Sequence, residues 1–213
     1  MTESTRVKVW DWPLRVWHWL FAICIGCLLY TGLSGDLSLL SWHMRFGCTM
    51  VGLVIFRLLW GIWGGLHARW PIYRVGPRAF FSHFRGGRVD DPHTAPGRAM
   101  AIAMVVLAGV QAGTGLFAND AIFNEGPLAR YVSGDTSNDL TWIHNRVFMG
   151  IIACAVVHLL AHAVYALRRD STPLAMFTGS KPADVAETPD YWMRALATAA
   201  IAGGLVWGAL EYF

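Results

Sequence analysis

Long apolar stretches separated by polar, proline-containing segments dominate the hydropathy pattern of this chain. Five of them cover residues 14–33, 42–63, 98–117, 140–167 and 191–212. A helix needs about 20 mostly apolar residues to cross a bilayer core about 30 Å thick, so each stretch predicts a transmembrane helix. No alternation of apolar and polar residues predicts a β-strand.

The composition supports an all-α integral membrane protein. Hydrophobic residues make up 55% of the chain and charged residues only 15%, whereas soluble domains average about 25% charged residues. The formal net charge is only +3, and we expect no nucleic-acid partner. The expected surroundings are the lipid bilayer.

Basic residues in the flanks of the stretches predict the orientation. Most of the Lys and Arg residues fall on one side, including Arg6 and Lys8 before the first stretch and Arg69 and Arg74 after the second. Loops rich in Lys and Arg stay in the cytoplasm. The N-terminus is therefore expected in the cytoplasm and, after five spans, the C-terminus in the periplasm.

Four histidines lie within the predicted spans at two depths. His18 is near the cytoplasmic start of the first stretch, and His43 and His144 are near the outer starts of the second and fourth. His158 follows His144 by fourteen residues, about 21 Å of helix, which returns it to the cytoplasmic third. Ionisable residues inside spans are functional candidates.

These depths predict two pairs of haem ligands. Fourteen residues make about four helical turns, so His144 and His158 share one helix face. The expected pairs are His18 with His158 on an inner haem iron and His43 with His144 on an outer one, because haem iron takes axial histidines. His162, one turn beyond His158, is an alternative inner ligand. A metal or ion transporter is a rival interpretation, disfavoured by the scarcity of Asp and Glu in the spans.

Three arginines and a glycine are further candidates for haem binding. Arg45 and Arg146 each follow an outer histidine by two residues, where they would bind haem propionates or reach for the membrane interface. Arg57, deep in the second stretch, is expected to bind a propionate of the inner haem. Gly47, one turn after His43, would let the flat macrocycle approach the backbone.

Several segments resemble the bacterial cytochrome b561 and nickel-hydrogenase b-type cytochrome family. They are VWDWPLRVWHW at 9–19, WHMRFG at 42–47, RLLWG at 57–61, GTGLFAND at 113–120, EGPLA at 125–129 and AMFTGSK at 175–181. The resemblance covers roughly residues 7–181. It suggests a four-helix transmembrane haem-binding domain at 1–181, followed by an additional transmembrane helix at 190–213.

The resemblance implies a di-haem b-type cytochrome of the bacterial inner membrane, with His18, His43, His144 and His158 as the ligands of two haem b. It also implies electron transfer between a quinone (ubiquinone or menaquinone) and a periplasmic or membrane partner. A periplasmic c-type cytochrome and a dehydrogenase or hydrogenase subunit are the expected partners. A superoxide:quinone oxidoreductase and a cytochrome b anchor subunit remain open alternatives. His162 and the fifth helix depart from the family pattern.

Overall fold

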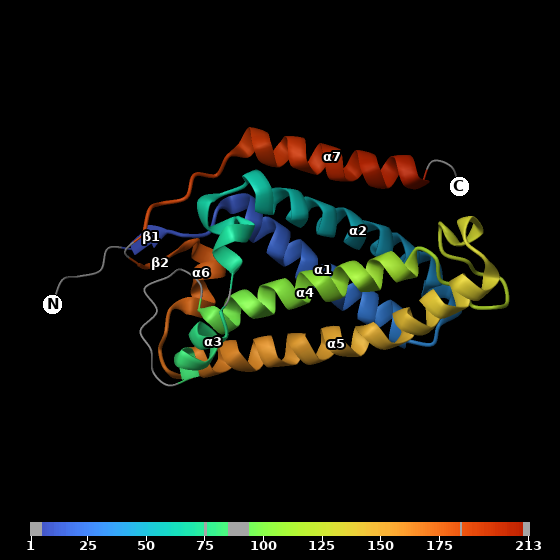
Figure 1. The fold of residues 1–213 in the computed structure, drawn as a ribbon, viewed down its shortest axis with the longest axis horizontal. Helices are drawn as coiled ribbons and strands as arrows, with labels where there is room; N and C mark the ends of the chain where they lie inside the picture. Colours follow the sequence, from blue (N-terminus) through green and yellow to red (C-terminus); the bar gives the residue numbers. More distant parts are fainter. Residues whose placement is uncertain (1–5, 75, 85–93, 184, 211–213) are drawn as a thin grey trace.

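The fold is a bundle of long helices that lie side by side along one axis (Figure 1). The computed structural model describes residues 6–74, 76–84, 94–183 and 185–210. Helices α1 (Trp12–Leu33), α2 (Leu40–Trp63), α4 (Ala95–Gly115) and α5 (Gly134–Leu167) run alternately in opposite directions. Helix α7 (Trp192–Leu210) lies along α2 at the edge of the bundle.

Four helical segments are long and apolar enough to cross a membrane: Trp12–Leu33, Leu37–Trp63, Ala95–Gly115 and Gly134–Leu167. They match the first four predicted stretches, and each helix begins a few residues earlier. Side chains of Asp11, Thr94 and Ser133 explain the earlier starts, because they accept backbone N–H groups in the first turns of α1, α4 and α5. Within the described residues α7 is not among these candidate spans, and Tyr212, the end of the fifth stretch, lies outside them.

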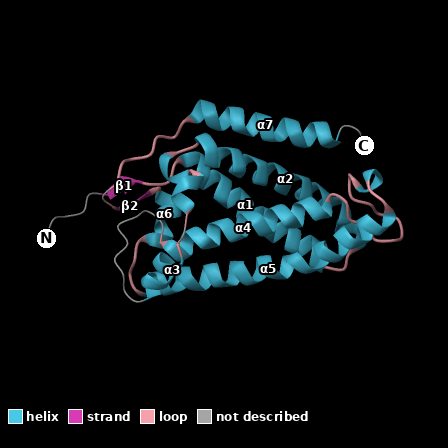
Figure 2. Ribbon diagram, viewed as in Figure 1, coloured by secondary structure: helices cyan, strands magenta, loops and turns pink. Residues whose placement is uncertain are grey.

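Short elements fill the connections between the long helices. They are η1 (Leu37–Leu39), η2 (Leu66–Ala68), η3 (Trp70–Tyr73), α3 (Pro77–Phe84), η4 (Ala129–Tyr131) and α6 (Thr172–Thr178). A two-stranded antiparallel sheet also pairs β1 (Arg6–Lys8) with β2 (Ser180–Pro182) (Figure 2). The expectation of no strand was wrong here. Three-residue strands are too short to show an alternating pattern, and their pairing depends on segments far apart in the chain.

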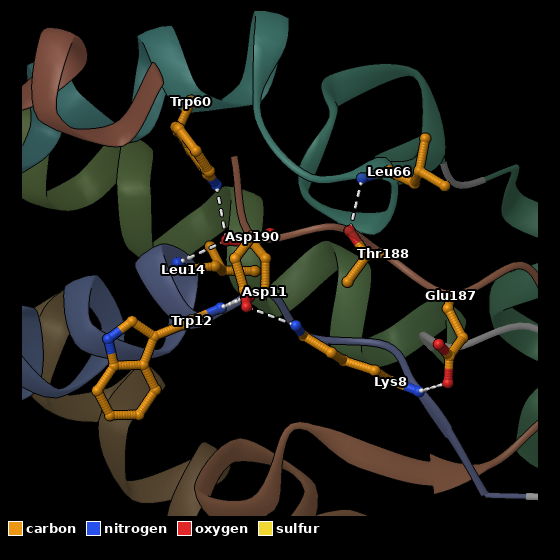
Figure 3. Close-up of polar contacts among 9 residues, drawn as sticks. All are labelled: Lys8, Asp11, Trp12, Leu14, Trp60, Leu66, Glu187, Thr188 and Asp190. Atoms are coloured by element: carbon orange, nitrogen blue, oxygen red, sulfur yellow. Dashed lines mark hydrogen bonds and ion pairs between the residues drawn. The ribbon is translucent and has the colours of Figure 1, made fainter. Parts of the chain in front are cut away.

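Polar contacts fasten the segment before α7 to the start of α1 (Figure 3). The Lys8 ammonium and the Asp190 carboxylate form an ion pair at 2.6 Å, and the backbone N–H of Trp12 donates to Asp190 at 2.8 Å. The N–H of Leu66 donates to the hydroxyl of Thr188 at 2.9 Å. The N-terminal strand, the end of α2 and the entry to α7 therefore meet at one end of the bundle.

The apolar core lies between α1, α2 and α4. Buried side chains from these three helices include Trp17, Phe21, Met50, Val54 and Val105. Outward faces stay apolar as well, with Ile23, Ile62 and Leu159 more than 60% exposed. Exposed apolar surface of this extent suits contact with lipid rather than water.

Candidate functional site

Two histidine rings face each other near one end of the bundle. His43 lies in the first turn of α2, and His144 lies ten residues into α5. Their ring centroids are 6.2 Å apart, and the ring planes cross at 90°. These are the two residues of the predicted outer pair, which two helices that are not consecutive in the chain bring together inside the bundle.

A second pair of rings lies toward the other end of α5. His18 on α1 and His158 on α5 have ring centroids 6.4 Å apart, with an interplanar angle of 52°. The ring of His162 lies one turn further along α5, 4.4 Å from the ring of His158 and 6.4 Å from that of Tyr165. The ring placed against His18 at this spacing is therefore that of His158.

Both spacings fit two imidazoles bound to one metal ion. A first-row metal bonds an imidazole nitrogen at about 2.0 Å, and that nitrogen lies about 1.1 Å from the ring centre, so two such ligands have centroids about 6 Å apart. A direct hydrogen bond between two rings would bring them closer. The donor set, two neutral imidazoles at each level, is the one that b-type haem iron accepts.

A cavity of about 450 Å³ surrounds the outer pair. His43, His144 and Gly47 are among the residues that line it, and a Cβ on Gly47 would meet no atom within 4 Å. Gly47 thus leaves open space beside the outer pair of histidines. Carboxylates also contribute to the lining: Asp36, Asp120 and Glu125.

The two outer arginines stack on tryptophans of their own helices. The Arg45 guanidinium lies 5.0 Å from the ring centre of Trp42. That of Arg146 lies 3.8 Å from the ring centre of Trp142 and donates to the Trp142 carbonyl at 3.0 Å. Neither arginine is part of the cavity lining around the outer pair.

Arg57 occupies an aromatic box at the other end of α2. It is 2% exposed, and its guanidinium carbon lies 4.3 Å from the ring centre of Trp70, 5.1 Å from Tyr73 and 5.7 Å from Trp17. Within the described residues, its buried Nη1 has no hydrogen-bond partner. Since Trp17 precedes His18, a predicted inner ligand, a buried cation with spare donor capacity lies close to the inner level.

A buried carboxyl group lies beside this box, just before α1. Asp11 is 1% exposed and accepts hydrogen bonds from the backbone N–H of Leu14 at 2.8 Å and from the indole of Trp60 at 3.1 Å. Burial raises the pKa of Asp11 to about 6, because a low-dielectric environment disfavours the charged form. Burial likewise raises the pKa of Tyr73.

The sequence analysis did not identify the residues that contact the imidazole rings of His43 and His144. Thr31 Oγ1 lies 3.0 Å from Nδ1 of His43, and the backbone carbonyl oxygen of Gln111 lies 2.9 Å from Nδ1 of His144. The tripeptide Thr-Gly-Leu occurs at 31–33, beside His43, and at 114–116, beside His144, and this repetition was the signal in the sequence that could have pointed to them. It is too short to stand out as a repeat before the structure shows what faces it.

Comparison with known proteins extends this picture. The search of curated proteins and the search of solved structures each returned no match. The family model described as prokaryotic cytochrome b561 matches residues 9–179, a range that contains both histidine pairs and all four candidate spans. The chain therefore belongs to the prokaryotic cytochrome b561 family, whose members are multi-pass membrane proteins that bind b-type haem and transfer electrons.

Proposed function

We propose that the chain binds two b-type haems, one between His18 and His158 and the other between His43 and His144. The observation that carries this proposal is the spacing of the rings, 6.4 Å in one pair and 6.2 Å in the other. Helix α5 supplies one ligand to each pair, about 21 Å apart along its axis. Bound haem would supply one-electron chemistry at its iron.

The function that this arrangement supports best is transmembrane electron transfer. Two redox centres at two depths connect the two membrane faces, while the buried side chains of α1, α2 and α4 keep water away from the space between them. The chain's own part is to bind, orient and insulate the cofactors. Arg57 is the proposed partner of an inner propionate, because its guanidinium is buried and its Nη1 finds no partner among the residues that the structure describes.

The proposed location is the bacterial inner membrane, with the N-terminus in the cytoplasm and the C-terminus in the periplasm. Strand β1 and the last turn of α7 lie at opposite ends of the bundle (Figure 1), and basic residues concentrate in the segments on the β1 side. We place α7 in the membrane as a fifth span. Large apolar side chains support this placement, with Leu196, Leu205 and Trp207 each more than half exposed.

Quinone, ubiquinone or menaquinone, is the proposed membrane-soluble partner, on the strength of the family. At the outer end, the carboxylates of Asp36, Asp120 and Glu125 that line the cavity favour a cationic partner such as a basic c-type cytochrome. The same charges oppose the approach of superoxide, an anion. A superoxide:quinone oxidoreductase is therefore the less favoured rival, and a hydrogenase or dehydrogenase anchor would need a further subunit.

Haem counting in purified histidine variants tests the proposal. The intact protein should hold two haems per chain by pyridine haemochrome assay. His43→Ala and His144→Ala should each leave only the inner haem, while His18→Ala and His158→Ala should leave only the outer one. His162→Ala is the matched control and should keep both. One haem in the intact protein, or inner haem lost from His162→Ala and retained in His158→Ala, would refute the assignment.

Rapid-mixing reduction assays distinguish the partners. The oxidised protein should be reduced faster by a reduced basic c-type cytochrome than by superoxide, and the rate should fall as salt screens the attraction. Replacing Asp36 and Glu125 with Asn and Gln should slow this reaction and weaken its salt dependence. Faster reduction by superoxide would favour the oxidoreductase alternative.

A further inference from the structure

The two outer histidines are supported by the same short sequence. Thr-Gly-Leu at 31–33 lies at the end of α1, next to His43 on α2. Thr-Gly-Leu at 114–116 lies at the end of α4, next to His144 on α5. The first helix of each pair thus ends in a tripeptide that contacts the ligand carried by the second helix.

Each glycine of these tripeptides makes room for an imidazole ring. A Cβ on Gly32 would lie 2.9 Å from Cε1 of His43, and a Cβ on Gly115 would lie 2.8 Å from Cε1 of His144. Carbon atoms in contact prefer about 3.5–4.0 Å. Only a residue without a side chain lets these rings lie against the neighbouring helix backbone.

The hydroxyl of Thr31 and the backbone carbonyl of Leu28 are both hydrogen-bond partners of the His43 ring. Its Oγ1 donates to the carbonyl of Cys27 at 2.8 Å and lies 3.0 Å from Nδ1 of His43. A hydroxyl has one proton to donate and two lone pairs. Because that proton is used within α1, Oγ1 accepts from Nδ1–H, and the lone pair of Nε2 stays free for a metal.

His144 is held in the same tautomer by a backbone group. The carbonyl of Gln111, which can only accept, lies 2.9 Å from Nδ1 of His144. The hydroxyl of Thr114 donates to the carbonyl of Val110 at 2.7 Å and lies 3.5 Å from the same Nδ1. The inner level differs, since the buried Nδ1 of His18 has no hydrogen-bond partner within the described residues.

We propose that the two Thr-Gly-Leu segments position the outer axial ligands, and that the Thr31 hydroxyl lowers the reduction potential of the outer haem. This inference rests on the proposed outer haem site. An acceptor on Nδ1–H fixes the orientation of a metal-binding histidine and makes its other nitrogen a stronger donor. A stronger axial donor stabilises the ferric more than the ferrous iron.

Glycine variants test the positioning. Gly32→Ala and Gly115→Ala should each reduce the haem content from two per chain to one, with the inner haem retained as evidence of a folded bundle. The controls are Gly26→Ala on α1 and Gly113→Ala on α4, where a Cβ would meet no atom within 4 Å. Both controls should keep two haems. Equal haem content in Gly115→Ala and Gly113→Ala would overturn the positioning role.

Thr31 variants test the tuning by spectroelectrochemical titration. Thr31→Val keeps the shape but removes one of the two acceptors beside His43, so the outer midpoint potential should become more positive while the inner potential stays unchanged. Thr31→Ser retains a hydroxyl and should restore the original value. An unchanged outer potential in Thr31→Val would refute only the effect of Thr31 on the potential. A single haem in the unmodified protein would instead refute the outer site itself.

Discussion

The indole nitrogen of Trp60 donates a hydrogen bond to the carboxylate of Asp11 across 3.1 Å (Figure 3). Trp60 is fully buried and Asp11 is 1% exposed. The same carboxylate caps the first turn of α1 through the N–H of Leu14. One side chain therefore joins the start of α1 to the end of α2, next to the aromatic box around Arg57.

Replacing Asp11 should destabilise the bundle in proportion to the hydrogen bonds lost. Asp11→Ala removes a helix cap, worth about 1 kcal/mol, and leaves a buried indole N–H unpaired, at about 1–3 kcal/mol. Asp11→Asn keeps the accepting oxygen and should cost less. Thermal unfolding in detergent, followed by haem absorbance, measures both. Equal losses would show that the charge matters and not the acceptor.

The raised pKa of Asp11 predicts a pH dependence with a definite sign. The folded state binds the proton more tightly than the unfolded state, because the pKa rises from 3.8 to about 6 on folding. The contribution of Asp11 to stability should therefore fall as the pH increases from about 4 to 6, by about 3 kcal/mol in total.

The Asp11→Asn variant isolates this contribution. Carboxyl groups distant from Asp11 titrate alike in both proteins and cancel in the difference, while Asp190, whose charge contributes to the raised pKa of Asp11, belongs to the same coupled response. The stability of the unmodified protein relative to Asp11→Asn should decline over this pH range and then level off. A constant difference from pH 4 to pH 7 would mean that the carboxyl titrates normally.

Removing the buried charge of Arg57 should make the inner haem harder to reduce. A unit charge at about 8 Å in an effective dielectric of about 20 contributes about 2 kcal/mol, or about 90 mV for one electron. Arg57→Met should shift the inner midpoint potential downward by this order, and Arg57→Lys by less. Arg45→Met, which removes a guanidinium stacked on Trp42, is the control. An unchanged inner potential in Arg57→Met would exclude a propionate contact.

Thr198 should matter for the attachment of α7 and not for haem binding. The indole of Trp63 on α2 donates to its hydroxyl at 2.9 Å, and Thr198 is fully buried. Thr198→Val leaves that N–H unpaired and should cost about 1–3 kcal/mol. Thr49→Val, which loses only a bond to the Arg45 carbonyl of its own helix, should cost less. Loss of haem from Thr198→Val would show that α7 supports the cofactor sites.

The outer arginines show why positions in the sequence did not determine every contact. Arg45 and Arg146 both follow a candidate ligand by two residues, which allowed two interpretations, propionate binding or interfacial placement. In the structure each stacks on a tryptophan three or four residues earlier on the same helix. Helical periodicity permits that neighbour as readily as a cofactor, so spacing alone could not choose between them.

The sequence by itself determined the four long spans and the depths of His18, His43, His144 and His158, because hydropathy and the rise of a helix are local properties. Only the tertiary structure decided the contacts made between segments: the ring spacings, the Thr31 and Gln111 supports, the Asp11–Trp60 bond and the β1–β2 pairing. Each joins residues distant in the chain, and their meeting depends on how the helices pack against one another.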